Sequence, residues 1–378
     1  MKRVISVILS IVLLLSLTAC GKSTLSDTQK EKLLQKAQED IDKTLFHGAV
    51  YATLYDKEIL NTAAGKANKD EDIDNSADIA YRYASITKQF TAAAIMKLYE
   101  QDKLSLQDTI DKYFPEYKHG KEITVHELLC MRSGLEDYIN DNDDTDSNGD
   151  AQGRKDSDIE FEVSPDKSSR ENRDAIEKWI FSQPLRFDPG SNFEYCSSGY
   201  MLLGEIVEQV SGESFSDFAR ENFFEPLGMT TAGFCGSYDK DGVTVAKAYH
   251  RSGGMEWAEY PGAWFAAGDL ICSPRDMSKW ANALMNGKVV SQESWKLMTT
   301  VYSKENPKRP YGYGLMVNST GGRTFVMHTG NFPSYCSAML MIPEEGYTCT
   351  TVSNHAEEIA VSLCNKITQD FKEVRYGE

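Results

Sequence analysis

The stretch Tyr83-Ala84-Ser85-Ile86-Thr87-Lys88-Gln89-Phe90 places a serine and a lysine three residues apart at the predicted start of a helix. Apolar residues then recur at spacings of three and four up to Leu98, which is typical of a helix with one buried face. Residues i and i+3 lie one above the other on a helix, so we expect the Lys88 amine beside the Ser85 hydroxyl. A nucleophilic serine needs such a base, together with backbone N–H donors for an oxyanion. Because Ser-x-x-Lys also occurs by chance at solvated helix ends, the rest of the chain has to decide between the two interpretations.

Composition limits the classes of function. The chain has 378 residues, 41% of them hydrophobic and 26% charged, which predicts a globular protein with a substantial core. The formal net charge is -17. Such an acidic chain would repel polyanions, so we expect neither nucleic acid nor an anionic membrane surface as a partner of the folded part.

The N-terminus has the features of a secretory signal. A basic pair precedes an apolar run from Ile5 to Leu17, which is too short to span a membrane. The sequence Leu17-Thr18-Ala19-Cys20 then resembles the bacterial lipobox, in which cleavage leaves a lipid-modified cysteine. We therefore expect a signal peptide at 1–19, lipidation at Cys20, a tether at 20–27 and an extracytoplasmic protein anchored to the bacterial membrane. The alternative is an ordinary signal peptide with an incidental cysteine.

The remaining cysteines form no recognisable framework. The chain has eight cysteines, and seven remain when Cys20 is set aside. They are scattered, without a C-x-x-C pair. This argues against both a disulfide scaffold and a zinc site, and we expect most of them to be small buried apolar residues.

Strand-like segments lie at both ends of the chain, with helices between them. Strands are expected at 49–54, 58–64, 311–317, 324–327, 335–342 and 347–353. Helices are expected at 28–46, 85–98, 104–114, 124–133, 175–181, 201–210, 214–224, 273–286, 291–299 and 357–371.

This order predicts a mixed α/β (α+β) domain over 28–378. The early hairpin would pair with the late strands in one antiparallel sheet, flanked by the terminal helices and making a lobe from about 28–83 and 310–378. A mostly helical lobe would cover about 84–309. Ser85 would then lie where the chain passes from one lobe to the other, and clefts favour such boundaries.

An acidic segment at 141–166 interrupts the pattern. It has ten acidic residues against Arg154 and Lys155, and is predicted to be exposed or disordered. Asp144, Asp146 and Asn148 match the first half of an EF-hand calcium loop, but Lys155 replaces its bidentate glutamate. A solvated acidic loop is therefore favoured over a calcium site.

Several blocks of sequence together resemble the serine β-lactamase and penicillin-binding protein superfamily, in its class C branch. Ser85-Ile86-Thr87-Lys88 looks like the Ser-x-x-Lys element of that superfamily. The other blocks occur in the order typical of the branch: Ile123 to Leu129 with Ser133-Gly134-Leu135, Phe187-Asp188-Pro189-Gly190, Tyr195-Cys196-Ser197-Ser198-Gly199-Tyr200, Pro226-Leu227-Gly228-Met229 and His328-Thr329-Gly330. The resemblance implies a β-lactamase/transpeptidase-like fold.

The resemblance also implies roles for four catalytic residues. Ser85 would be the nucleophile that forms an acyl-enzyme, and Lys88 its immediate partner. Tyr195 would exchange protons with the nucleophile and the leaving group. For this we expect its pKa to be lowered by cationic Lys88, with help from His328.

Three further positions are implied to bind substrate. His328-Thr329-Gly330 would line the edge of the cleft, and the backbone N–H groups of Ser85 and Asn331 would form the oxyanion hole. The family's Tyr-x-Asn element has Ser197 at its third position here, so a substrate-contacting amide is missing. A serine has one donor where the amide has two, which casts doubt on efficient β-lactam hydrolysis.

The function implied by the resemblance is that of a monomeric serine hydrolase without metal or organic cofactor. Its substrates would be peptidoglycan-derived peptides with D-amino acids, followed by short esters and then β-lactams. In activity it would be similar to a D-Ala-D-Ala carboxypeptidase or an esterase. The alternative is a catalytically weak relative that binds muropeptides or a partner protein.

Overall fold

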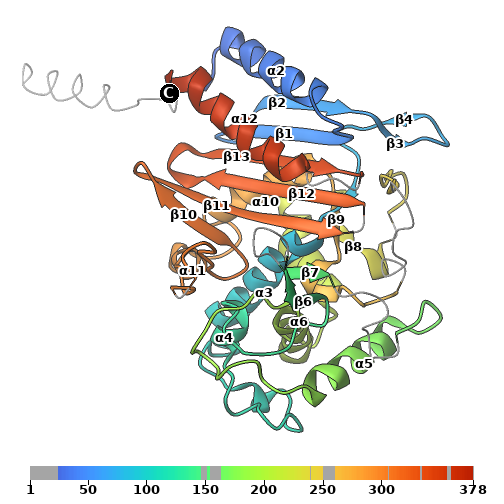
Figure 1. Cartoon of the computed structure of the whole chain (residues 1–378), viewed down its shortest axis with the longest axis vertical. Coiled ribbons are helices and arrows are strands. Elements are labelled where there is room, and N and C mark those ends of the chain that lie inside the picture. Colours follow the sequence, from blue (N-terminus) through green and yellow to red (C-terminus); the bar gives the residue numbers. More distant parts are fainter. Residues whose placement is uncertain are drawn as a thin grey trace, which may run out of the picture.

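The first and last strands of the chain lie side by side in one antiparallel sheet (Figure 1). The computed structural model describes residues 24–145, 151–153, 163–238, 240–249, 260–304, 306–332, 334–355 and 359–377. The order in the sheet is β10-β11-β12-β13-β1-β2. The strands are β1 (Gly48–Leu54), β2 (Lys57–Ala64), β10 (Met316–Thr320), β11 (Arg323–Phe332), β12 (Tyr335–Ile342) and β13 (Tyr347–Ser353). The predicted pairing of the early hairpin with the late strands is confirmed.

One face of the sheet is covered by the two terminal helices. These are α2 (Asp27–Asp42) and α12 (Ile359–Tyr376), which pack together beside the sheet in Figure 1. Alternate strand residues such as Val50 and Leu340 point into this layer and join Leu33 and Ile367 from the helices. Side chains alternate between the two faces of a strand, so the intervening residues face the opposite layer.

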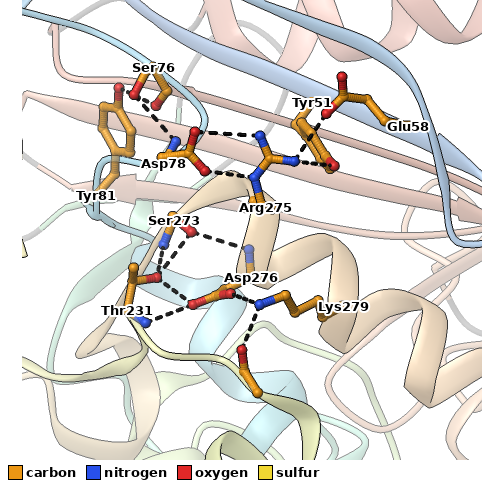
Figure 2. Close-up of polar contacts among 11 residues, drawn as sticks. Tyr51, Glu58, Ser76, Asp78, Tyr81, Thr231, Ser273, Arg275, Asp276 and Lys279 are labelled. Atoms are coloured by element: carbon orange, nitrogen blue, oxygen red, sulfur yellow. Dashed lines mark hydrogen bonds and ion pairs between the residues drawn. The ribbon is translucent and has the colours of Figure 1, made fainter.

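The opposite face packs on α10 (Pro274–Met285) through polar as well as apolar contacts. Thr53 and Thr348 form a buried hydrogen-bonded cluster with Ser278 of the helix, at separations of 2.7–3.2 Å. Figure 2 shows the start of α10, where Ser273 accepts a hydrogen bond from the Asp276 N–H and Arg275 binds Asp78, Glu58 and the Tyr51 hydroxyl. The predicted Ser-Pro start of α10 is thus confirmed. The contacts of Arg275 with Tyr51 on β1 and Glu58 on β2 hold this helix against the sheet.

The remaining helices lie mainly below this face in Figure 1 and build the larger of two apolar cores. Phe90 stacks on Trp280 of α10 at 3.7 Å between ring centroids. The helices are α3 (Lys88–Glu100), α4 (Val125–Leu129), α5 (Ser169–Ser182), α6 (Ser197–Ser211), α7 (Phe215–Ala219), α8 (Glu225–Leu227), α9 (Phe265–Gly268) and α11 (Gln292–Met298). A π-helical turn, η4 (Arg220–Phe224), joins α7 to α8.

Several predicted boundaries were wrong. The predicted strand at 311–317 begins only at Met316, because Gly314 has a φ of +67° and turns the chain against the Lys88 carbonyl. Only a 3₁₀ turn, η2 (Ile110–Lys112), forms in the helix predicted at 104–114. α4 has the predicted Thr124–Glu127 capping box but ends at Leu129.

The acidic segment contains regular structure that its composition did not predict. β6 (Asn140–Thr145) pairs with β7 (Ala151–Gly153) in a short antiparallel ladder. Backbone groups make such a ladder, so it can form even in a strongly polar sequence. Asp146, Asn148 and Lys155 of the calcium-loop pattern, and Cys20 with the predicted signal peptide, lie outside the described residues.

The described residues also bear on membrane insertion, metal binding and cysteine chemistry. No helix among them is both long and apolar enough to cross a membrane. No cluster of three or more metal-ligating side chains occurs within the described ranges. Of the seven cysteines there, six are buried and Cys235 is half-buried, which agrees with the expectation of small apolar core residues.

Candidate active site

Ser85 lies on a 3₁₀ turn, η1 (Ala84–Thr87), between the short strand β5 (Tyr81–Arg82) and α3. The preceding residue, Ala84, has a φ of +47°, although it is not a glycine. A left-handed conformation of this kind costs of order 1–3 kcal/mol and persists only where the surroundings enforce it. The sharp turn thus presents Ser85 at the start of the helix while Ala84 itself is buried.

Lys88 meets Ser85 as the motif predicts. Its Nζ lies 3.0 Å from Ser85 Oγ and donates a second hydrogen bond of 2.8 Å to the Ala267 carbonyl oxygen. The side chain is 0% exposed. Burial lowers the pKa of Lys88 from 10.5 to about 7, against the opposing charge of Asp137. Near neutral pH, a large share of this amine is therefore uncharged and able to accept a proton.

The carbonyl that holds Lys88 belongs to α9. Thr91 donates a 2.6 Å hydrogen bond to the neighbouring Ala266 carbonyl, so α9 is tied to α3 at two successive positions. Phe265, which begins α9, has a φ of +31°. Unusual backbone conformations thus occur on both sides of the lysine, in the Ala84 turn and in α9.

Tyr195 also contacts the predicted nucleophile. Its hydroxyl hydrogen-bonds with the Ser85 side chain, and Lys88 Nζ lies 5.0 Å from the centre of its ring. Burial raises the pKa of Tyr195, and the hydrogen bond with Ser85 offsets this only in part. The expected lowering of its pKa is therefore wrong, because desolvation of a phenolate outweighs the nearby amine.

His328 lies beside Tyr195, with 6.3 Å between the centres of the two rings. It is 1% exposed. Its Nδ1 lies 2.6 Å from the Thr329 carbonyl oxygen, which can only accept, so the Nδ1–H donates and Nε2 accepts from the Tyr311 hydroxyl at 3.0 Å. Burial and the charge of Lys88 lower the pKa of His328 to about 3. A neutral imidazole cannot help to lower the pKa of Tyr195, which corrects that expectation.

The strand that carries His328 passes directly against the Ser85 turn. A Cβ at Gly330 would overlap the Tyr83 carbonyl oxygen, and the hydroxyl of Ser337 donates to that same oxygen at 3.0 Å. Glycine is therefore required for the approach of β11 to the turn. Asn331 follows Gly330 on β11 and is exposed. The role of the Asn331 N–H in an oxyanion hole stays a prediction.

Ser197 is buried in the first turn of α6 and contacts a group that the sequence did not single out. Its backbone N–H donates to Asp137 Oδ2 at 2.9 Å. The Ser197 hydroxyl oxygen lies 3.4 Å from Asn140 Nδ2. The buried Asp137 carboxylate also accepts from the Ile139 N–H at 2.8 Å and from Asn140 Nδ2 at 2.7 Å.

Sequence reasoning missed Asp137 and Asn140. Both follow Ser133-Gly134-Leu135 closely, but lie about sixty residues from Ser197 in the chain. The one available signal was a pair of carboxylates, Glu136 and Asp137, between Leu135 and Tyr138 and next to a recognised block. Their placement beside Ser197 depends on a long-range contact that local sequence does not encode.

Known proteins match this chain over most of its length. The family model described as Beta-lactamase matches residues 33–363. PbpX of Bacillus subtilis (strain 168), named as a penicillin-binding protein, is 29% identical over 286 residues, or 75% of this chain. The matched part spans 65% of the length of that relative. Protein flp of Staphylococcus aureus (strain N315) is 25% identical over 368 residues, covering 92% of this chain and 69% of the relative.

Solved structures with the same fold include two from other bacteria. The D-amino acid amidase of Ochrobactrum anthropi SV3 has a TM-score of 0.75 at 22% identity, covering 92% of this chain and 100% of that one. A penicillin-binding protein of Bacillus halodurans has a TM-score of 0.73 at 22% identity, covering 89% and 99%. They confirm the predicted fold class, and the family match over residues 33–363 shows that this chain belongs to the Beta-lactamase family of serine hydrolases.

Proposed function

We propose that this protein hydrolyses amide or ester bonds of D-amino-acid compounds through an acyl-enzyme at Ser85. The observation that carries the proposal is the 3.0 Å contact between Ser85 Oγ and a buried Lys88 whose pKa is about 7. A base works best when its pKa lies near the working pH, and Lys88 meets this condition where Tyr195 does not.

In the acylation step, neutral Lys88 takes the Ser85 hydroxyl proton while Oγ forms a bond to the substrate carbonyl carbon. The carbonyl oxygen becomes an oxyanion, for which the Ser85 and Asn331 N–H groups are the proposed donors. The bond to the leaving group then breaks. Tyr195, hydrogen-bonded to the same serine, would donate its hydroxyl proton to the departing atom, and the protonated Lys88 amine would return a proton to Tyr195. Water repeats the sequence on the acyl-enzyme and frees Ser85.

The leading substrate class is a peptide, amide or ester with a D-amino acid at the acyl position, of the kind found in cell walls. Short esters rank second and β-lactams third. The names of the similar proteins support this order, since they include a D-amino acid amidase and penicillin-binding proteins. Ser197 weighs against strong β-lactam hydrolysis, because its hydroxyl is buried against Asn140.

The test uses two probes and one variant. Purified protein is incubated with a fluorescent penicillin and, separately, with p-nitrophenyl acetate, and wild type is compared with Ser85→Ala. Labelling or turnover that disappears in the variant supports the proposal. If the wild type shows neither acylation nor ester cleavage, the enzyme proposal is wrong and the binding relative takes its place.

We also propose that the protein acts outside the cytoplasmic membrane, tethered through a lipid on Cys20. The support is the sequence Leu17-Thr18-Ala19-Cys20 after a basic and then apolar N-terminus. Membrane fractionation of cells that produce the Cys20→Ala protein tests this. Release of the variant from the membrane fraction is expected, and its retention there would contradict the anchor.

A further inference from the structure

Asn140 provides a side-chain amide next to the position where the Tyr-x-Asn pattern lacks one. Its Nδ2 lies 2.7 Å from Asp137 Oδ2 and 3.4 Å from the Ser197 hydroxyl oxygen. Ser197 is two residues from Tyr195, whose hydroxyl contacts Ser85. The amide therefore comes from the first residue of β6, and not from α6.

The orientation of this amide is fixed by its partners. The Asp137 carboxylate only accepts, so the Asn140 nitrogen must face it, and both N–H groups are then directed at Asp137 and Ser197. The oxygen, Oδ1, has no donor among the residues that the structure describes, and Asn140 is half-buried. The group offered to a ligand is thus an acceptor, where an asparagine at 197 would offer donors as well.

A negative charge lies directly behind that oxygen. Asp137 is 0% exposed and accepts hydrogen bonds from Ile139, Ser197 and Asn140. Its Oδ2 accepts from the N–H of Ser197, two residues after Tyr195, and its charge raises the pKa of both Lys88 and Tyr195. Hydrogen bonding to a carboxylate polarises the Asn140 amide and strengthens its oxygen as an acceptor.

We propose that Asn140 Oδ1, backed by Asp137, binds a free amino group on the acyl part of the substrate, so that the enzyme prefers D-amino acid amides and esters with an unblocked amine over N-acylated ones. This inference rests on the proposed function and narrows its substrate class to amides and esters of D-amino acids with a free amine, as opposed to peptides in which that amine is acylated. A penicillin or an N-acyl peptide carries an amide in place of the amine and cannot bring a positive charge to this position.

Such a substrate also suits the chemistry at Ser85. A substrate ammonium in the site would repel the cationic form of Lys88 and favour the neutral amine that accepts the serine proton. The Asp137 charge offsets the cost of burying that ammonium. A substrate ammonium would therefore both bind at Asn140 and favour the neutral form of Lys88 that activates Ser85.

The experiment compares kcat/KM for D-alanine p-nitroanilide and N-acetyl-D-alanine p-nitroanilide. The wild type is expected to favour the free amine at least tenfold. Asn140→Ala is expected to reduce that ratio about tenfold. Asn61→Ala, at an exposed position on β2, is the matched control and is expected to leave the ratio as in the wild type. A ratio that Asn140→Ala does not change overturns the proposal.

A binding measurement keeps this inference separate from the proposed activity. In the Ser85→Ala background, calorimetric titration with D-alaninamide should show a Kd at least fivefold weaker when Asn140 is also alanine. Equal Kd values for the Ser85→Ala protein and the Ser85→Ala, Asn140→Ala double variant would overturn the role of Asn140. Ser85-dependent cleavage of p-nitrophenyl acetate without a preference for the free amine refutes only the inference. Absence of any Ser85-dependent turnover refutes the proposed function, and the titration then decides on Asn140 alone.

Discussion

The two faces of the sheet differ in the kinds of side chain that are buried against them. The layer under α2 and α12 is mainly an apolar core, and its ion pairs join exposed and buried groups. Lys36 binds Glu373 at 3.0 Å, and Asp370, which is 1% exposed, binds Lys36 and Lys366, whose side chains are 25% and 45% exposed. On the other face, Lys88, His328 and Asp137 are all buried to 1% exposure or less. Buried ionisable groups reduce stability unless they are well paired, so the inner face bears a larger cost than the outer face, where the buried Asp370 is paired with two lysines.

Backbone strain divides in the same way. Left-handed residues near the outer layer, Tyr55 and Asp56, make the β1–β2 hairpin turn, where such conformations are normal. On the inner side, Ala84 and Phe265 adopt positive φ beside the lysine, without a hairpin to require it. Backbone strain and buried ionisable groups therefore occur together around Lys88, and sites that combine such costs are typically functional.

The largest expected effect is on the inner face. Lys88→Met keeps the length of the side chain but removes the base, and a general base contributes about 10²–10⁴-fold to a rate. We expect p-nitrophenyl ester hydrolysis to fall by about 10³-fold. Lys97→Met, on the same helix but bonded to the Val289 carbonyl, is the control and should stay near wild type. A Lys88→Met enzyme with more than a tenth of wild-type activity would remove the distinction between the two faces.

The close approach of β11 provides a second test. Gly330→Ala puts a methyl group against the Tyr83 carbonyl and the Ser337 hydroxyl, so β11 has to move away from the Ser85 turn. We expect turnover of the same ester to fall about 10²-fold, since small displacements in an active site have effects of this size. Gly236→Ala, whose new Cβ would make only ordinary contacts, is the control. Equal activity of the two variants would show that the approach is unimportant.

The outer face should respond in stability and not in catalysis. Ile367→Ala removes a fully buried side chain between α12 and the sheet, and is expected to lower the free energy of unfolding by about 2–5 kcal/mol. Urea unfolding measures the loss, while kcat for the ester should stay at the wild-type value. Leu34→Ala, on the exposed side of α2, should cost little. If Ile367→Ala lowers kcat as strongly as stability, the two layers are coupled.

Lys88 should also show the stability cost of the inner face directly. Its pKa is about 7 in the folded protein against 10.5 ordinarily, so between these values the unfolded chain binds a proton that the folded one does not. The free energy of unfolding therefore rises with pH between about 7 and 10.5, as the cost of burying the charged amine is removed. Below that window the folded protein carries the full cost.

Lys88→Met should consequently be more stable than wild type near pH 7. The pKa difference corresponds to at most about 5 kcal/mol, and loss of two hydrogen bonds of about 1 kcal/mol each reduces the gain to a few kcal/mol. Thermal unfolding at pH 7 and pH 10 measures it, and the gain should shrink at the higher pH. A Lys88→Met protein less stable than wild type at pH 7 would show that the lysine imposes no such cost.

Sequence predicted the local features of this molecule well. β12 and β13 begin and end at the predicted residues, and Ser273 caps α10 as expected, because side-chain alternation and caps are local signals. The Ser85–Lys88 contact was predictable for the same reason, since it depends only on helical spacing.

What sequence could not predict depends on burial and on contacts between distant segments. The raised pKa of Tyr195 follows from desolvation, which the motif does not encode. The approach of Asn140 to Ser197 joins segments far apart in the chain. The left-handed Ala84 follows from no local preference, because alanine disfavours that conformation.

The central claim is that the buried Lys88 amine activates Ser85, and the pH dependence of acylation tests it most directly. His328, with a pKa of about 3, and Tyr195, with a raised pKa, do not change charge near neutrality. The rate of Ser85 acylation by p-nitrophenyl acetate should therefore rise with pH and level off above an apparent pKa of about 7, as Lys88 loses its proton. A rate that is flat between pH 5 and 9, or that rises only near the ordinary pKa of lysine, would contradict the account.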